Sequence, residues 1–133
     1  MKPKYIIDAG ALALYFAGDE RVKEYFVEIL KGKAEGYTCE VNLTEFYYKT
    51  IEKIGEETAN IRYISIRNSP IRQIPAEGEL TRQAAKTKLK YKGKISLADA
   101  YLIALTNQTK GIVLTTDKRV KEILKDKCKY FKI

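Results

Sequence analysis

Histidine and tryptophan are absent from this chain of 133 residues, and it has only two cysteines and three prolines. Without histidine, a serine or cysteine nucleophile served by a histidine base is excluded, and so is histidine-based ribonuclease chemistry. Cys39 and Cys128 lie far apart in the sequence and form no metal-spaced pair. We therefore expect neither a disulfide framework nor a zinc site, and we predict that both cysteines are small core residues.

Long apolar runs are missing as well. The basic start, Met1 to Lys4, is followed by an apolar segment that ends at Asp8 and is too short for a signal peptide or a membrane span. We therefore expect a cytoplasmic protein with no membrane partner. The length and the composition, 45% hydrophobic and 32% charged, fit a single globular domain over residues 1–133. The net charge of +8 predicts attraction to polyanions, which alone is a weak indication of function.

The stretch from Lys4 to Gly10 organises the rest of the chain. Its short apolar run, Tyr5 to Ile7, is rich in β-branched and aromatic residues and is stopped by a glycine, which is typical of a buried strand leading into a turn. A strand buried on both faces suits the centre of a parallel sheet. Asp8 would then lie at the carboxyl end of that strand, where open α/β sheets place their ligand crevice.

Strand-like and helix-like segments alternate along the chain, which indicates an α/β fold. Further strands are predicted at Tyr37 to Val41, Ile71 to Ile74, Ile112 to Leu114 and Lys129 to Ile133. Helices are predicted over Ala11 to Phe16, 19–30, 43–54, Glu77 to Leu89, Ser96 to Asn107 and Val120 to Leu124. The apolar residues of Glu56 to Arg67 fit neither the helical nor the strand period, and the acidic start of this segment and the length of the connection favour a helix there.

Four carboxylates stand out by their position. Asp8 and Asp117 each end an apolar strand, whereas Glu45 and Asp99 are each expected in the first turn of a helix. Carboxylates held close together repel one another unless they are protonated or neutralised, and a hard divalent cation with oxygen ligands is the natural solution. In a chain without histidine or paired cysteines, Mg²⁺ or Mn²⁺ is favoured over zinc.

Each acid also has a purely structural interpretation. Ser96 with Asp99, and Asn42 with Glu45, have the spacing of a capping box, and Asp8 and Asp117 suit helix caps or turns. Asp99 argues most strongly for a site, because the residues around it make its helix apolar on nearly every side. A carboxylate on such a buried helix is costly unless it meets a cation or is fully hydrogen-bonded.

Together, the strand ending at Asp8, the helical Glu45, the segment Ser96-Leu97-Ala98-Asp99-Ala100 and the segment Thr115-Thr116-Asp117 resemble the PIN-domain ribonucleases. The likeness is greatest to the VapC toxins of VapBC toxin–antitoxin pairs and covers essentially the whole chain. It implies a three-layer α/β/α sandwich with a central parallel sheet in the order 3-2-1-4-5. It further implies a Mg²⁺- or Mn²⁺-dependent endoribonuclease, an antitoxin partner and a homodimer, for which helices bearing Tyr47, Tyr48, Tyr63 or Ile64 are candidate surfaces.

On the matching positions, the metal-site and catalytic acids are Asp8, Glu45, Asp99 and Asp117, and Thr115 matches a supporting hydroxyl residue. The chain departs from the family in having Ala9 and Gly10 where a hydroxyl residue often follows the first acid, and in having Arg119 at a position that is acidic in some relatives. The implied reaction is metal-assisted hydrolysis of a phosphodiester bond, which requires no protein nucleophile.

A dense basic run precedes the Asp99 helix. It consists of Lys86, Lys88, Lys90, Lys92 and Lys94, with Tyr91 as a candidate surface for base stacking. Either contact with RNA or a solvated surface explains this lysine strip.

Three other functions remain open. A housekeeping RNA-processing nuclease would use the same chemistry, and a non-catalytic RNA-binding or partner-binding domain would not need all four acids. A phosphoacceptor or phosphatase domain would require a second acid next to Asp8 or two residues beyond it, and Ala9 and Gly10 stand there instead.

Overall fold

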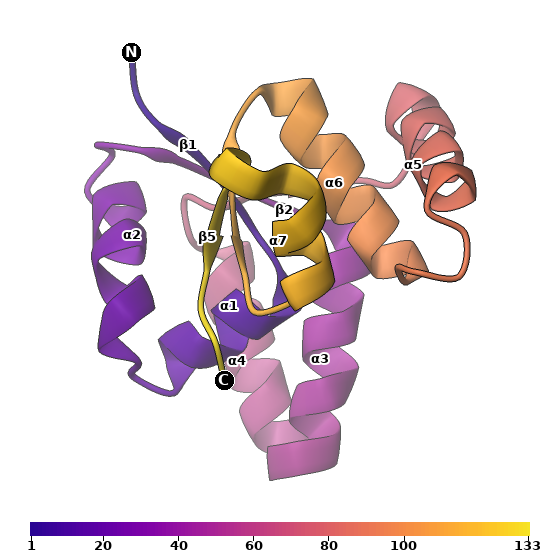
Figure 1. The fold of residues 1–133 in the computed structure, drawn as a ribbon. Helices are drawn as coiled ribbons and strands as arrows, with labels where there is room; N and C mark the ends of the chain where they lie inside the picture. The colour runs from indigo at the N-terminus through magenta and orange to yellow at the C-terminus, as the bar shows by residue number, and fades with distance from the viewer.

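A five-stranded parallel sheet forms the centre of the molecule, in the order β3-β2-β1-β4-β5, as expected. The computed structural model describes residues 1–133 (Figure 1). No helix in it is both long and apolar enough to cross a membrane. The strands are β1 (Lys4–Ile7), β2 (Glu35–Cys39), β3 (Arg72–Ile74), β4 (Ile112–Thr115) and β5 (Cys128–Tyr130).

Two apolar clusters cover the two faces of this sheet. The side chains of β1 alternate between them, since Tyr5 and Ile7 belong to one cluster and Ile6 to the other. Helices α1, α2 and α4 contribute to the first cluster, and α5, α6 and α7 contribute to the second, so the sheet lies between two helical layers (Figure 1). The helices are α1 (Ala9–Phe16), α2 (Glu20–Leu30), α3 (Glu40–Ile54), α4 (Glu56–Arg67), α5 (Gly78–Lys90), α6 (Leu97–Thr109) and α7 (Lys118–Leu124), and a short 3₁₀ turn, η1, covers Lys125–Lys127.

Two predicted strands were misplaced. The second strand was expected at Tyr37 to Val41, but it begins at Glu35, which pairs with Lys4 of β1, and it ends at Cys39. Helix α3 starts directly afterwards, so Val41 lies in a helix, although valine prefers strands. Its side chain packs against the second apolar cluster. The last strand ends at Tyr130 rather than Ile133, although the Phe131 amide still donates to Thr115 O at 2.9 Å.

The register of the sheet brings the ends of β1 and β4 together. Ile7 pairs with Leu114, and the Asp8 amide donates to Leu114 O at 3.1 Å. Gly10 follows at the start of α1, and a Cβ there would lie 1.9 Å from Thr116 Oγ1. Glycine at position 10 therefore lets the turn after β4 approach α1, which places Asp8 beside the segment from Thr115 to Asp117.

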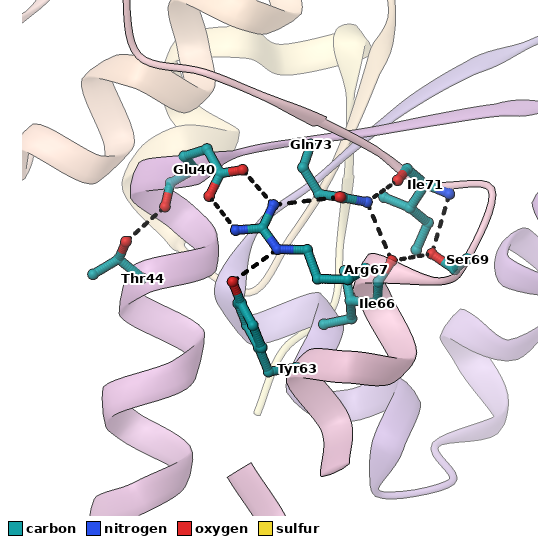
Figure 2. A network of polar contacts seen from close by, with 8 residues as sticks. All are labelled: Glu40, Thr44, Tyr63, Ile66, Arg67, Ser69, Ile71 and Gln73. Carbon is teal, nitrogen blue, oxygen red and sulfur yellow. Dashed lines mark hydrogen bonds and ion pairs between the residues drawn. The ribbon is translucent and has the colours of Figure 1, made fainter. Parts of the chain in front are cut away.

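A polar network fixes α4 against the start of α3 (Figure 2). The guanidinium of Arg67, at the end of α4, donates to both oxygens of Glu40 on α3, including a bond of 2.8 Å from Nη2 to Oε1. It also donates to Tyr63 Oη at 2.9 Å and to Gln73 on β3 at 3.4 Å. One arginine therefore joins two helices and the edge strand, which holds the orientation of the α3–α4 pair.

Candidate functional site

All four predicted acids line one pocket at the carboxyl end of the sheet. Asp8 follows β1, Asp117 follows β4, Glu45 comes from α3 and Asp99 from α6. The pocket has a volume of about 430 Å³. Its lining also includes apolar side chains, Phe46 among them, and three basic side chains from α3 and α4: Lys49, Lys53 and Arg62.

Asp8 is buried and fully engaged. It caps helix α1, because its Oδ1 accepts the Ala11 amide at 2.7 Å, while its Oδ2 accepts the Thr116 amide at 3.2 Å and the Thr115 hydroxyl. Burial raises the pKa of Asp8 to about 6, although the hydrogen bonds from Thr115, Ala11 and Thr116 each lower it. The charge of Glu45 adds to the rise. An acid with this pKa is poised to lose its proton to a cation near neutral pH.

Thr115 joins two of the acids. Its hydroxyl donates to Asp8 and accepts the Asp117 amide at 3.0 Å, and the residue is completely buried. The hydroxyl therefore sets the position of the Asp8 carboxylate relative to the turn that carries Asp117. The supporting role expected for Thr115 from the family resemblance stays a prediction, and these contacts are compatible with it.

Asp99 and Asp117 shift each other's pKa. Asp99 is 8% exposed, and burial, followed by the hydrogen bond and charge of Asp117, raises its pKa. Burial alone would raise the pKa of Asp117 too, but hydrogen bonds with Asp99 and from Arg119 outweigh it, and the net shift is downward. The proximity of the two groups thus favours the protonated form of Asp99 and the ionised form of Asp117.

Asp99 and Asp117 also make the capping contacts that were predicted for them. Ser96 and Asp99 form a capping box, in which Ser96 Oγ accepts the Asp99 amide at 3.1 Å and Asp99 Oδ2 accepts the Ser96 amide at 3.3 Å. Asp117 caps α7 by accepting the Arg119 amide at 2.8 Å. Capping fixes the orientation of each carboxylate and leaves its other oxygen for the pocket, so the structural and functional interpretations are compatible.

Glu45 lies in the second turn of α3, so its predicted place in the first turn was wrong. The cause is the early start of α3 at Glu40, directly after β2. From this position Glu45 lines the pocket and pairs with Lys49, four residues later, at 2.8 Å between Oε2 and Nζ. The pair neutralises part of the negative charge in the pocket.

Asn42 does not cap a helix, which removes the suggested capping box with Glu45. It lies inside α3, where its Nδ2 donates to Ala98 O at 3.2 Å and ties α3 to the start of α6. The side chain is 1% exposed and lines the pocket, and its Oδ1 has no hydrogen-bond partner. A buried carbonyl oxygen without a donor costs about 1–3 kcal/mol, so this atom is suited to accept a bond from a water or to contact a cation in the pocket.

These residues fit a hard divalent cation in their chemistry. The donors are carboxylate and amide oxygens, with no nitrogen or sulfur ligand among them, and hard cations such as Mg²⁺ prefer oxygen. In their present positions, no three acids converge closely enough to hold an ion. Glu45 is turned to Lys49, so loading a cation requires that this pair opens.

The lysine strip lies outside the pocket. None of Lys86, Lys88, Lys90, Lys92 and Lys94 is among the lining residues. Lys88 donates to Ile95 O at 2.6 Å, and Lys90 lies over the ring of Tyr91, which is half-buried against the second apolar cluster. The role of the strip in RNA binding stays a prediction, and Lys49, Lys53 and Arg62 are the basic residues that the sequence reasoning missed. The spacing of Glu45, Lys49 and Lys53 at four-residue intervals was the available signal.

This chain resembles a known sequence family and several solved structures. The sequence model of the PIN domain matches residues 5–125. No curated protein matches the chain in sequence. The chain is similar in structure to Mycobacterium tuberculosis VapC20, a Sarcin-Ricin loop cleaving toxin, with a TM-score of 0.73 and 18% identity over 90% of this chain and 94% of that one.

Two complexes extend the comparison. A toxin–antitoxin complex from Klebsiella pneumoniae gives a TM-score of 0.69 at 13% identity, over 97% of this chain and 99% of that one. VapBC2 from Rickettsia felis, solved with a DNA fragment from its promoter, gives 0.71 at 14% identity, over 90% and 92%. At these identities the likeness shows a shared fold.

Proposed function

Because the chain belongs to the PIN domain family, we propose that it is a divalent-metal-dependent endoribonuclease that hydrolyses RNA phosphodiester bonds. The observation that carries this proposal is the pocket at the carboxyl end of the sheet, which is lined by Asp8, Glu45, Asp99 and Asp117. Burial raises the pKa of Asp8 and Asp99, which opposes their ionisation. A bound cation would favour the ionised form of both acids.

Each acid has a distinct part in the proposed reaction. Asp8 and Asp99, the two buried acids, would hold Mg²⁺ or Mn²⁺, with Asp117 beside them, while Thr115 keeps Asp8 in place. Glu45, once released from Lys49, would complete the ligand set or orient the attacking water. When bound, the cation supplies the charge and Lewis acidity that phosphodiester hydrolysis by water needs. No side chain has to act as a nucleophile, which agrees with the lack of histidine.

We further propose that the protein is the toxin of a type II toxin–antitoxin pair, with an antitoxin as its partner. The support is the similarity in fold to VapC20 and to toxin–antitoxin complexes over at least 90% of this chain. A surface for protein contact exists on α3 and α4, where Tyr48, Ile61 and Ile64 are more than half exposed. The same surface is a candidate for a homodimer. A neighbouring gene for a small DNA-binding protein would separate a toxin from a housekeeping nuclease.

Metal removal tests the proposed activity. We expect the purified protein to cleave labelled single-stranded RNA in millimolar Mg²⁺ or Mn²⁺, to stop in excess EDTA, and to resume when the metal is restored. The Asp99→Asn protein, purified in parallel, controls for contaminating nuclease. Undiminished cleavage in the chelator would refute metal-dependent hydrolysis by this pocket.

A further inference from the structure

Arg62 differs from every other arginine of the chain. The other five arginines each form an ion pair with a carboxylate: Arg21, Arg67, Arg72, Arg82 and Arg119. Arg62 makes no ion pair and no side-chain hydrogen bond, although it is half-buried and lines the pocket. A guanidinium has five donors in a planar fork that matches phosphate, so all of the hydrogen-bonding capacity of Arg62 remains available.

An aromatic platform holds this free guanidinium in place. The Arg62 guanidinium carbon lies 5.4 Å from the centroid of the Phe16 ring, and Phe16 stacks on the buried Phe46 at 5.7 Å between centroids. A cation above an aromatic face is held without an anion. The Arg67 network fixes α4, the helix that carries Arg62, against α3 (Figure 2). The guanidinium is thus positioned in advance rather than left mobile on the surface.

Two lysines extend this positive wall along α3. Lys49 and Lys53 follow Glu45 at intervals of four residues, which places all three side chains on one face of the helix. Lys53 is exposed and has no ion pair, and Lys49 is paired with Glu45. The pocket therefore combines acids from the sheet edge, α3 and α6 with cations from α3 and α4.

We propose that Arg62 and Lys53 form the binding site for the phosphate backbone of single-stranded RNA, and that Lys49 joins them when Glu45 leaves it. This inference rests on the proposed nuclease function, because it assigns the charges that hold the substrate of that same pocket. Carboxylates alone repel a polyanion, so cations on the pocket wall have to offset that repulsion where the scissile bond approaches. The lysine strip, on α5 and the turn that follows it, lies outside the pocket and cannot supply this contact inside it.

The test compares two proteins that have lost the same charge. In Arg62→Gln/Lys53→Gln, two wall cations are removed, and in the control Lys23→Gln/Arg82→Gln, two exposed cations outside the pocket are removed. Binding of a fluorescent twelve-nucleotide oligouridylate is measured in Ca²⁺, as a non-catalytic substitute for Mg²⁺, across a salt series. We expect the wall variant to bind about tenfold more weakly and its log-log salt slope to flatten by roughly 1.4, or about 0.7 per lost phosphate contact. The control should retain the wild-type slope.

Two further measurements distinguish a lost phosphate contact from a loss of structure. The wall variant should keep its thermal melting temperature within a few degrees, and at saturating RNA its kcat in Mg²⁺ should change much less than its KM. Arg62→Lys should keep the salt slope while binding more weakly than wild type, because it retains the charge and loses the planar fork.

The outcomes separate this proposal from the proposed function. If the wild type cleaves RNA but the wall variant and the control have parallel slopes, the phosphate site is refuted and the nuclease stands. If the wall variant keeps its RNA affinity but loses binding to an acidic protein partner, the wall serves that partner and the proposal also fails. If the wild type neither binds nor cleaves RNA, the proposed function itself is refuted.

Discussion

Asp99→Asn is expected to abolish RNA cleavage while raising the free energy of unfolding of the metal-free protein. Asparagine keeps an oxygen that accepts the Ser96 amide, so the capping box survives. It also removes a negative charge from the pair with Asp117 and offers that carboxylate an amide donor. We expect stabilisation of roughly 1 kcal/mol in a chelator. Cleavage should fall at least about a hundredfold, since even the partners of metal ligands are worth ten- to a hundredfold.

Urea unfolding in EDTA and in Mg²⁺, beside an RNA cleavage assay, measures both effects. Mg²⁺ should raise the free energy of unfolding of the wild type and do little for Asp99→Asn, since a ligand stabilises only the protein that binds it. Asp99→Ala is the matched control, because it loses the bond from the Ser96 amide to the Asp99 side chain and should cost about 0.5–2 kcal/mol. If Asp99→Asn keeps wild-type activity, Asp99 is a helix cap and nothing more.

The metal-free protein should become less stable as the pH rises from about 5 to 7.5. Burial raises the pKa of Asp8 to about 6 and raises that of Asp99, so the folded state binds more protons in this range than the unfolded chain, whose aspartates titrate near pH 3.9. The stability that these protonated acids provide is complete below about pH 4 and is lost as the pH passes their folded pKa. The expected loss is on the order of 1–3 kcal/mol.

Because the chain has no histidine, a change in stability between about pH 5 and 7.5 can be assigned to the buried acids. No other side-chain type ordinarily titrates there, and acids with lowered pKa values, such as Asp19 and Glu35, add their stability at lower pH. The free energy of unfolding is measured by urea titration in EDTA at several pH values. The same series in Mg²⁺ is the control, and stability there should hold or rise with pH, because protons compete with the cation. A rise in EDTA between about pH 5 and 7.5 would contradict the buried-acid assignment.

Strong local patterns predicted most of the fold. The buried apolar run before Asp8, the Gly111 turn into β4 and the apolar surroundings of Asp99 each specify a local structure. The helix over Glu56–Arg67 also begins and ends where it was expected, although that prediction rested on an acidic start and on the length of the connection rather than on apolar spacing. The prediction failed at Glu35 to Val41, because sheet pairing with β1 decides where β2 starts and local preference does not. The missing residues of β5 have the same cause, since an edge strand ends where its neighbour stops pairing.

For the site, sequence predicted the acids but not their partners. The order of Asp8, Glu45, Asp99 and Asp117 was visible in the chain, and the structure places all four around one pocket. The contact of Lys49 with Glu45 was readable from helical spacing, but the position of Arg62 on Phe16 depends on how α4 packs against α1, which no local pattern encodes. The predicted RNA contact was the lysine strip, because it is the densest basic run in the sequence. The cations of the pocket are instead dispersed over α3 and α4.

Crystals of the wild-type protein soaked in Mn²⁺ provide the most direct measurement of the central claim, that these carboxylates form a divalent-cation site. Anomalous scattering locates Mn²⁺ without reference to any assumed ligand. We predict a peak in the pocket in contact with oxygens of Asp8 and Asp99, with Glu45 turned away from Lys49, and no such peak in Asp99→Asn. A wild-type crystal that shows no Mn²⁺ in this pocket, or shows it only elsewhere on the surface, would contradict the account.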